Sequence, residues 1–418
     1  MSLFGKNYPE SWRIDDWENP WLPAPVRFLN AIPEKLIKHL TPFDEAHLLD
    51  NARRQTGLSD FGDEDFRLPF RILLQDLNQY DHFTNLGRIT AQTILQQQLC
   101  ARLHLENKLK QSPDIYQQKV DSPLIIAGLP RTGTTHLHNL LACANTLRYM
   151  PLWQTLQPAT PSGSGRDRRR LAADMAVYSV KHIIPLFPRM HEMETDEPHE
   201  ELTVCALCYR SFFFEGAFQV PHYRHWYAEN SHEKGYGYLK QTLQILQTET
   251  APGNKAATAR WVLKSPQHVD QLETILKIFP DAKLLLTRRD PVRAVLSMIT
   301  MMLYSSRQVY KPRRLKEEAQ AWVERLEQML RRSEIQAAGI PADRLFRVDF
   351  DEFMADPRSM IRRIAAFAEV PLDESSWQAI ENHLGSHTRD RHGRIDYRFE
   401  DLGLDENALR ERFAFYRT

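Results

Sequence analysis

The feature that most constrains the fold is an apolar run at residues 124–127 that passes directly into a turn and then a helix. The run reads Leu-Ile-Ile-Ala, which is typical of a strand buried on both faces. Turn residues follow at Gly128 and Gly133, and residues 137–144 then place apolar side chains at helical spacing on one side. A buried strand followed by a short turn and a helix is the repeating unit of a parallel sheet.

The same unit recurs three times along the chain. Further strands are predicted at 261–263, 283–286 and 345–348, and each is followed by a polar turn and a helical pattern. Because parallel neighbours need helical crossovers, the alternation predicts an α/β fold, with a three-layer parallel sheet flanked by helices.

Helical spacing also dominates the rest of the chain. Residues 1–120 are expected to form a helical N-terminal region packed on the core, and residues 121–418 the α/β domain, with a helical insertion at about 155–255. Between 158 and 170 the sequence changes to Ser-Gly-Ser-Gly and then to an arginine-rich stretch from Arg166 to Arg170. That stretch predicts a loop with solvated charges.

Charge and cysteine content exclude several classes of protein. The 54 Lys and Arg residues balance the 54 Asp and Glu residues, so no overall field attracts nucleic acid and any basic site must be local. The apolar runs are shorter than the ~18 residues of a membrane span, and residues 1–21 lack a signal-peptide core. Four cysteines are too few for a disulfide framework, which favours a reducing, cytoplasmic location. We expect Cys205 and Cys208 to form a buried helix pair rather than a metal site.

The turn after the first predicted strand has the composition of an anion-binding loop. Residues 128–135 read Gly-Leu-Pro-Arg-Thr-Gly-Thr-Thr, so backbone N–H groups, hydroxyls and a helix N-terminus meet there. A Walker A loop has a lysine where Thr134 stands, whereas the cation here is Arg131. This difference argues against a Mg-dependent nucleoside triphosphatase, which needs the loop lysine on the terminal phosphates.

A second basic motif follows the strand predicted at 283–286. Arg289 comes just after this strand and Ser297 lies eight residues later, with Asp290-Pro291 favouring a helix start between them. Arginine presents a planar fork to a phosphate, and a serine on the helix adds a hydroxyl donor. Two phosphate cradles are therefore expected at the ends of neighbouring strands.

Together these motifs resemble those of the sulfotransferases that use 3′-phosphoadenosine 5′-phosphosulfate (PAPS). Residues 130–135 resemble the 5′-phosphosulfate loop of that family, and residues 287–297 resemble its 3′-phosphate motif, on a P-loop-like fold. Residues 391–393 resemble the Arg-Lys-Gly with which many members hold the 3′-phosphate. The resemblance implies the following donor-binding residues: Arg131, Thr132, Gly133, Thr134, Thr135, Arg289, Ser297, Arg391 and Gly393.

A third motif concerns the chemistry. Lys264 follows the strand predicted at 261–263 and is similar to the strand-end lysine that precedes the family's catalytic turn. Cytosolic members carry a histidine two residues after that lysine, whereas here Pro266 stands there and His268 comes four residues after Lys264. The pattern Leu-Lys-Ser-Pro-x-His, like the stretch at 57–63, resembles the bacterial branch of the family.

The resemblance implies catalytic roles but leaves the base open. Lys264 or Arg131 would neutralise the charge that develops on the bridging oxygen as the S–O bond breaks. The base is His268, or Glu194 or a neighbour in the acidic cluster at 191–201, or no protein group. This scheme requires no metal, and the sequence has no dedicated metal-ligand spacing.

The expected function is sulfuryl transfer from PAPS to a hydroxyl or amine of a small or lipid-like acceptor. The aromatic stretch at 212–227 either lines the acceptor pocket or belongs to an ordinary core. One alternative function is a P-loop kinase or nucleoside triphosphatase with a degenerate loop, in which Asp349 or Asp290 would hold the metal. Another is a non-catalytic nucleotide-binding protein of the same fold. The oligomeric state and the identity of the acceptor are not predicted.

Overall fold

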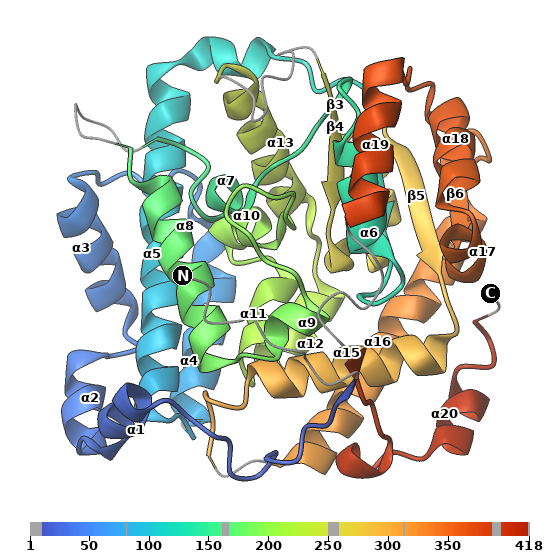
Figure 1. The fold of residues 1–418 in the computed structure, drawn as a ribbon. Helices are drawn as coiled ribbons and strands as arrows, with labels where there is room; N and C mark the ends of the chain where they lie inside the picture. Colours follow the sequence, from blue (N-terminus) through green and yellow to red (C-terminus); the bar gives the residue numbers. More distant parts are fainter. Residues whose placement is uncertain are drawn as a thin grey trace.

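A five-stranded parallel sheet is the framework of the fold and lies in the right half of Figure 1, with the N-terminal helices on the left. The computed structural model describes residues 11–80, 82–160, 167–249, 259–311, 314–386 and 394–416. In their order across the sheet, the strands are β3 (Leu147–Arg148), β4 (Arg260–Lys264), β2 (Leu124–Ala127), β5 (Lys283–Arg288) and β6 (Leu345–Asp349). All neighbouring pairs run parallel, which confirms the predicted fold class.

The four predicted strands are all present, and the structure adds a fifth to this sheet and a separate parallel pair, β1 (Ser11–Trp12) and β7 (Arg394–Ile395). The predicted runs agree with β2, β4, β5 and β6 to within two residues at either end. β3 lies at the edge of the sheet and pairs with β4 over two residues. A strand of two residues shows no periodic pattern, and for this reason the sequence did not predict it.

Alternate residues of the strands face opposite sides of the sheet and build two separate cores. Leu124 and Ile126 of β2 pack into one core, whereas Ile125 and Ala127 pack into the other. The first core is closed by α6 (Thr134–Ala142), α17 (Phe350–Ala355), α18 (Pro357–Ala368) and α19 (Glu374–Ser386). The second includes α14 (Leu272–Ile278), α15 (Pro291–Ser305), α16 (Leu315–Ala338) and α20 (Glu406–Arg412).

The N-terminal helices extend this second core. Leu95 and Leu99 are fully buried in the same core as Ile125, so this region packs directly behind the sheet. The predicted boundary near residue 120 falls between the last of these helices and β2, and it stays a prediction. The helices are α1 (Ala24–Ala31), α2 (Glu34–Leu40), α3 (Glu45–Thr56), α4 (Arg67–Gln79) and α5 (Asn85–Gln111).

None of the helices in the described part of the chain is both long and apolar enough to cross a membrane.

A helical segment connects β3 to β4, in the region where the insertion is predicted. Cys205 ends one of its helices, and Cys208 lies in the 3-10 turn that follows. Both thiols are buried, and burial raises their pKa, as expected for core cysteines. The helices are α7 (Leu152–Leu156), α8 (Arg169–Ile183), α9 (Phe187–Met190), α10 (Leu202–Cys205), α11 (Phe212–Ala217), α12 (Pro221–Glu229) and α13 (Glu233–Gln247).

The arginine-rich stretch runs into the first turn of α8 and differs from the prediction. Arg166 lies outside the described residues. Arg169 is buried rather than solvated, because its guanidinium lies 3.0 Å from the Asp167 carboxylate and stacks on the Trp153 ring at 4.7 Å. The prediction of solvated charges is therefore wrong at Arg169, whose charge is compensated by nearby partners.

Candidate active site

The loop between β2 and α6 directs the N-terminus of α6 toward the carboxyl ends of the strands. α6 begins at Thr134, and Gly133 caps it with a φ of +85°. A Cβ at Gly133 would lie 3.1 Å from Cδ2 of Phe350, so both the backbone angle and the space favour glycine. The Thr132 hydroxyl lies 2.6 Å from that of Thr287, which ties the loop to β5. The first N–H groups of α6 lack partners within the helix, which is what the predicted anion site requires.

The two basic motifs meet at this loop. Nε of Arg131 donates to the Ser297 hydroxyl on α15 at 3.2 Å. Nη1 of Arg289 donates to the backbone carbonyl of Arg131 at 2.6 Å, and its guanidinium stacks on the Phe350 ring at 4.2 Å. The Arg131 guanidinium also donates to the Met190 carbonyl. Two guanidinium groups and a hydroxyl thus converge beside the start of α6, where β2 and β5 are neighbours.

β4 lies on the other side of β2, and its last residue brings a buried cation to the same region. Lys264 pairs with Ile126 of β2 in the sheet, which places it beside the loop. Its Nζ donates to the Thr135 hydroxyl at 3.3 Å and lies 2.6 Å from the Glu200 carboxylate. The Lys264 side chain is only 2% exposed and that of Glu200 13%. Lys264 therefore links the loop to the acidic cluster.

The charge on Glu200 is maintained by its surroundings. Burial alone would raise the pKa of this carboxyl, but Lys264 outweighs burial, His191 and His199 add to its effect once they are protonated, and the pKa is held at about 2. The two imidazole rings lie 5.6 Å apart between centroids. Burial lowers the pKa of His191 to about 4 and that of His199 to about 3. At neutral pH the site therefore holds a charged Glu200 beside two uncharged imidazoles.

The two candidates that the sequence named for the base, His268 and Glu194, have other partners than Lys264. His268 is fully buried, with Nδ1 2.8 Å from the Tyr236 hydroxyl and Nε2 3.5 Å from the Glu201 carboxylate. Glu194 is about half exposed, and its carboxylate lies 2.6 Å from Nζ of Lys181. The carboxylate that reaches Lys264 is Glu200, from the same acidic cluster as Glu194. The sequence named the cluster that contains Glu200, but no local signal distinguished Glu200 within it.

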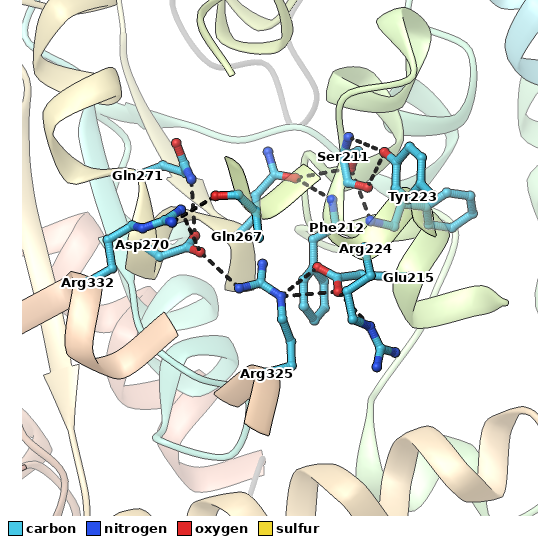
Figure 2. Close-up of polar contacts among 12 residues, drawn as sticks. Ser211, Phe212, Glu215, Tyr223, Arg224, Gln267, Asp270, Gln271, Arg325 and Arg332 are labelled. Carbon is cyan, nitrogen blue, oxygen red and sulfur yellow. Dashed lines mark hydrogen bonds and ion pairs between the residues drawn. The ribbon is translucent and has the colours of Figure 1, made fainter. Parts of the chain in front are cut away.

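Buried polar contacts hold the turn that follows β4 (Figure 2). Gln267 accepts a hydrogen bond from the Ser211 hydroxyl at 3.0 Å. At the other end of the turn, Asp270 lies 3.3 Å from the Arg325 guanidinium. Arg325 also donates from Nε to both carboxylate oxygens of Glu215, at 3.0 and 3.1 Å. The turn is thereby attached to α11 and α16, which fixes the direction in which β4 ends.

The remaining residues predicted for the site lie outside the described ranges or have structural partners. Arg391 and Gly393 lie outside the described residues. Asp290 and Asp349 cap α15 and α17 through their carboxylates. Within the described ranges, no group of three or more His, Cys, Asp or Glu side chains could hold a metal ion. Most aromatic side chains at 212–227 are buried in the second core, as an ordinary core requires.

His138 on α6 offers a test by pH. It is fully buried with Nε2 3.3 Å from the Val262 carbonyl, and burial, assisted by Lys264, lowers its pKa to about 3. An unfolded histidine titrates near pH 6.5, so below that pH the unfolded chain gains a proton that the native protein resists. The share of the unfolding free energy that depends on uncharged His138 is therefore fully present above pH 6.5. It falls as the pH is lowered, and at pH 5 about 2 kcal/mol of it is lost.

We expect the substitution His138→Gln to remove this share of the acid sensitivity. The measurement is urea unfolding of both proteins at pH 7 and pH 5. His182→Gln, at an exposed position of α8, is the control. Between pH 7 and pH 5 this variant should lose as much unfolding free energy as the unsubstituted protein. An equal loss in the His138→Gln variant would contradict the prediction.

Comparison with known proteins identifies the family and agrees with the fold. A model of the sulfotransferase family matches residues 123–374, which is more than half of the chain. Sulfotransferase STF9 from Mycobacterium avium is 27% identical over 90% of this chain and 96% of its own, with a TM-score of 0.78. Sulfotransferase STF1 from Mycobacterium tuberculosis H37Rv shares the fold, at 24% identity over 89% of this chain and 98% of its own, with a TM-score of 0.76. The comparison with curated proteins gave no match. The family match, together with the fold, shows that this chain belongs to the sulfotransferase family.

Proposed function

We propose that this sulfotransferase takes its sulfuryl group from PAPS and transfers it to a hydroxyl or amine of a small or lipid-like acceptor. The observation that carries the proposal is the contact of Arg131 with both Ser297 and Arg289 beside the start of α6. A nucleotide with phosphate groups at its 5′ and 3′ positions needs two such basic groups within one site.

The residues present suit such a donor. Arg131 and the backbone N–H groups of residues 132–135 would hold the 5′-phosphosulfate, and Arg289 with Ser297 would hold the 3′-phosphate. Arg391 and Gly393 are proposed as additional contacts of the 3′-phosphate. When bound, PAPS supplies an activated sulfuryl group whose leaving group is a phosphate. The Thr132 hydroxyl and backbone N–H both donate to the Leu129 carbonyl, at 2.7 and 3.4 Å, so this residue shapes the loop.

Lys264 and Glu200 are proposed as the catalytic pair. Transfer forms a bond between sulfur and the acceptor oxygen or nitrogen, and the bond between sulfur and the bridging oxygen breaks. Lys264 stabilises the negative charge on the departing phosphate. Glu200 accepts the proton of the acceptor. When the ammonium of Lys264 turns toward the phosphate, Glu200 loses its cation partner and its pKa rises, so the carboxylate becomes a stronger base.

Binding of the desulfated product, adenosine 3′,5′-bisphosphate, tests the donor assignment. We expect this ligand to raise the melting temperature without Mg²⁺, and to do so more than Mg-ATP. Arg289→Ala should weaken its binding on the order of 10²-fold, because a charge-assisted contact to phosphate is lost. The measurement is calorimetric titration together with thermal unfolding.

A matched control is available on the same helix. Arg293 is exposed in the first turn of α15, so Arg293→Ala should bind the bisphosphate nearly as well as the unsubstituted protein. Stabilisation by Mg-ATP but not by the bisphosphate would overturn the donor assignment and favour the kinase alternative.

A further inference from the structure

A second buried group of polar side chains lies directly behind the Lys264–Glu200 pair. Both carboxylate oxygens of Glu201 accept from the backbone N–H of Lys264, each at 3.1 Å. His268 Nε2 lies 3.5 Å from the same carboxylate, and the Tyr236 hydroxyl lies 2.8 Å from His268 Nδ1. Glu201 and His268 are both 0% exposed. The row Tyr236–His268–Glu201 therefore ends at the main chain of Lys264.

This arrangement joins two adjacent glutamates to one lysine. Glu201 binds the main chain of Lys264, and Glu200 binds its side chain. The helix that begins after them, α10, has only four residues and can do little by itself to fix their direction. Burying a carboxylate away from water costs several kcal/mol unless it is compensated. At Glu201, burial raises the pKa, and the Lys264 N–H and the nearby His268 offset only part of this effect. Glu201 therefore holds the main chain of the residue whose side chain pairs with Glu200.

We propose that Glu201 and His268, with Tyr236 behind them, are positioning residues that hold the Glu200 carboxylate against the Lys264 ammonium. The inference rests on the proposed function only for the catalytic role of that pair. It also gives His268 a different task from that of general base, one of the roles that the sequence left open. Neither Glu201 nor His268 is required to touch donor or acceptor.

The test is a double-mutant cycle between Glu201 and Glu200. Glu201→Ala should lower kcat on the order of tenfold, because displacing a catalytic group by a fraction of an ångström is costly, while KM and bisphosphate affinity stay within about threefold. Glu201→Gln keeps an acceptor oxygen for the Lys264 N–H and should recover most of the rate. In a Glu200→Gln background, Glu201→Ala should have almost no further effect on kcat, because the group it positions is gone.

A second measurement needs no bound donor. Acetylation of Lys264 by a small acylating reagent, followed by mass spectrometry of the ligand-free protein, should be faster in Glu201→Ala than in the unsubstituted protein. Bisphosphate affinity then shows that the phosphate loop is intact. Together these readouts separate misalignment of the pair from general loss of structure.

If Glu201→Ala does not fold, two variants that change less of the buried group test the proposal instead. Tyr236→Phe and His268→Gln should each lower kcat by less than Glu200→Gln does. Tyr238→Phe is the matched control, since this residue lies on the same helix and its hydroxyl binds Glu106, away from Lys264. It should leave kcat unchanged.

The outcomes distinguish this inference from the proposed function. Full activity of Glu200→Gln would remove the base assigned above, and with it this inference. If Glu200→Gln lowers kcat and the losses of Glu200→Gln and Glu201→Ala multiply in the double variant, the positioning role alone is overturned. A larger loss in His268→Gln than in Glu200→Gln would make His268 the base and would also overturn it.

Discussion

Replacing Lys264 by methionine is expected to lower kcat for sulfuryl transfer by 10²- to 10³-fold, about 3 to 4 kcal/mol of transition-state stabilisation. Lys264 is 2% exposed, so little water replaces the lost cation. Its ammonium lies next to both the Thr135 hydroxyl and the Glu200 carboxylate, where leaving group and acceptor meet in the proposed reaction. The measurement is turnover of labelled PAPS in an acceptor screen read by mass spectrometry.

Two further variants separate chemistry from stability in this experiment. Lys264→Met leaves Glu200 without its cation and therefore also destabilises the fold. The double variant Lys264→Met/Glu200→Gln removes both charges and should regain stability, while its kcat stays low. Lys181→Met removes an exposed lysine that pairs with Glu194, and it should keep full activity. A Lys264→Met enzyme within tenfold of the unsubstituted rate would exclude the catalytic role.

The largest loss of stability is expected for Arg325→Met, at about 3 to 5 kcal/mol in the free energy of unfolding. The side chains of Arg325, Glu215 and Asp270 are all exposed by 2% or less (Figure 2). Burial alone would lower the pKa of Arg325, but Glu215 and Asp270 raise it, so the guanidinium stays charged. Its removal leaves two buried carboxylates with weaker compensation, mainly from Arg224 and Arg332 at the rim. Urea unfolding measures the loss.

Arg331 on the same helix is the matched control for this prediction. Its Nε lies 2.8 Å from Glu327 one helical turn away, and its side chain is 52% exposed. Arg331→Met should therefore cost less than about 1 kcal/mol, because a surface ion pair is weakened by water and salt. Equal stability losses for Arg325→Met and Arg331→Met would show that the buried cluster does not stabilise the fold.

The sequence predicted most of the sheet and the contact between the two motifs. β2, β4 and β5 are short apolar runs that leave a clear local pattern, and they are adjacent in the sheet. Arg131 and Arg289 follow two of these strands, so parallel pairing alone brings them to one edge. Their contact through the Arg131 carbonyl agrees with that expectation.

The partners of Lys264 could not be predicted in the same way. Glu200 and Glu201 lie more than sixty residues before Lys264, in a connection between short helices without a regular period. His268 looked suitable as a base because it follows Lys264 closely in sequence. The 3-10 turn Pro266–Asp270 instead directs its ring into the core, toward Tyr236.

The sequence by itself determined the strands of the parallel sheet, the turn at residues 128–135 and the positions of the basic residues, since each depends on neighbours along the chain. Only the tertiary structure decided which carboxylate faces Lys264 and which histidine is buried. Those choices depend on how the β3–β4 insertion packs across the end of the sheet, and packing between distant segments leaves no period in the sequence.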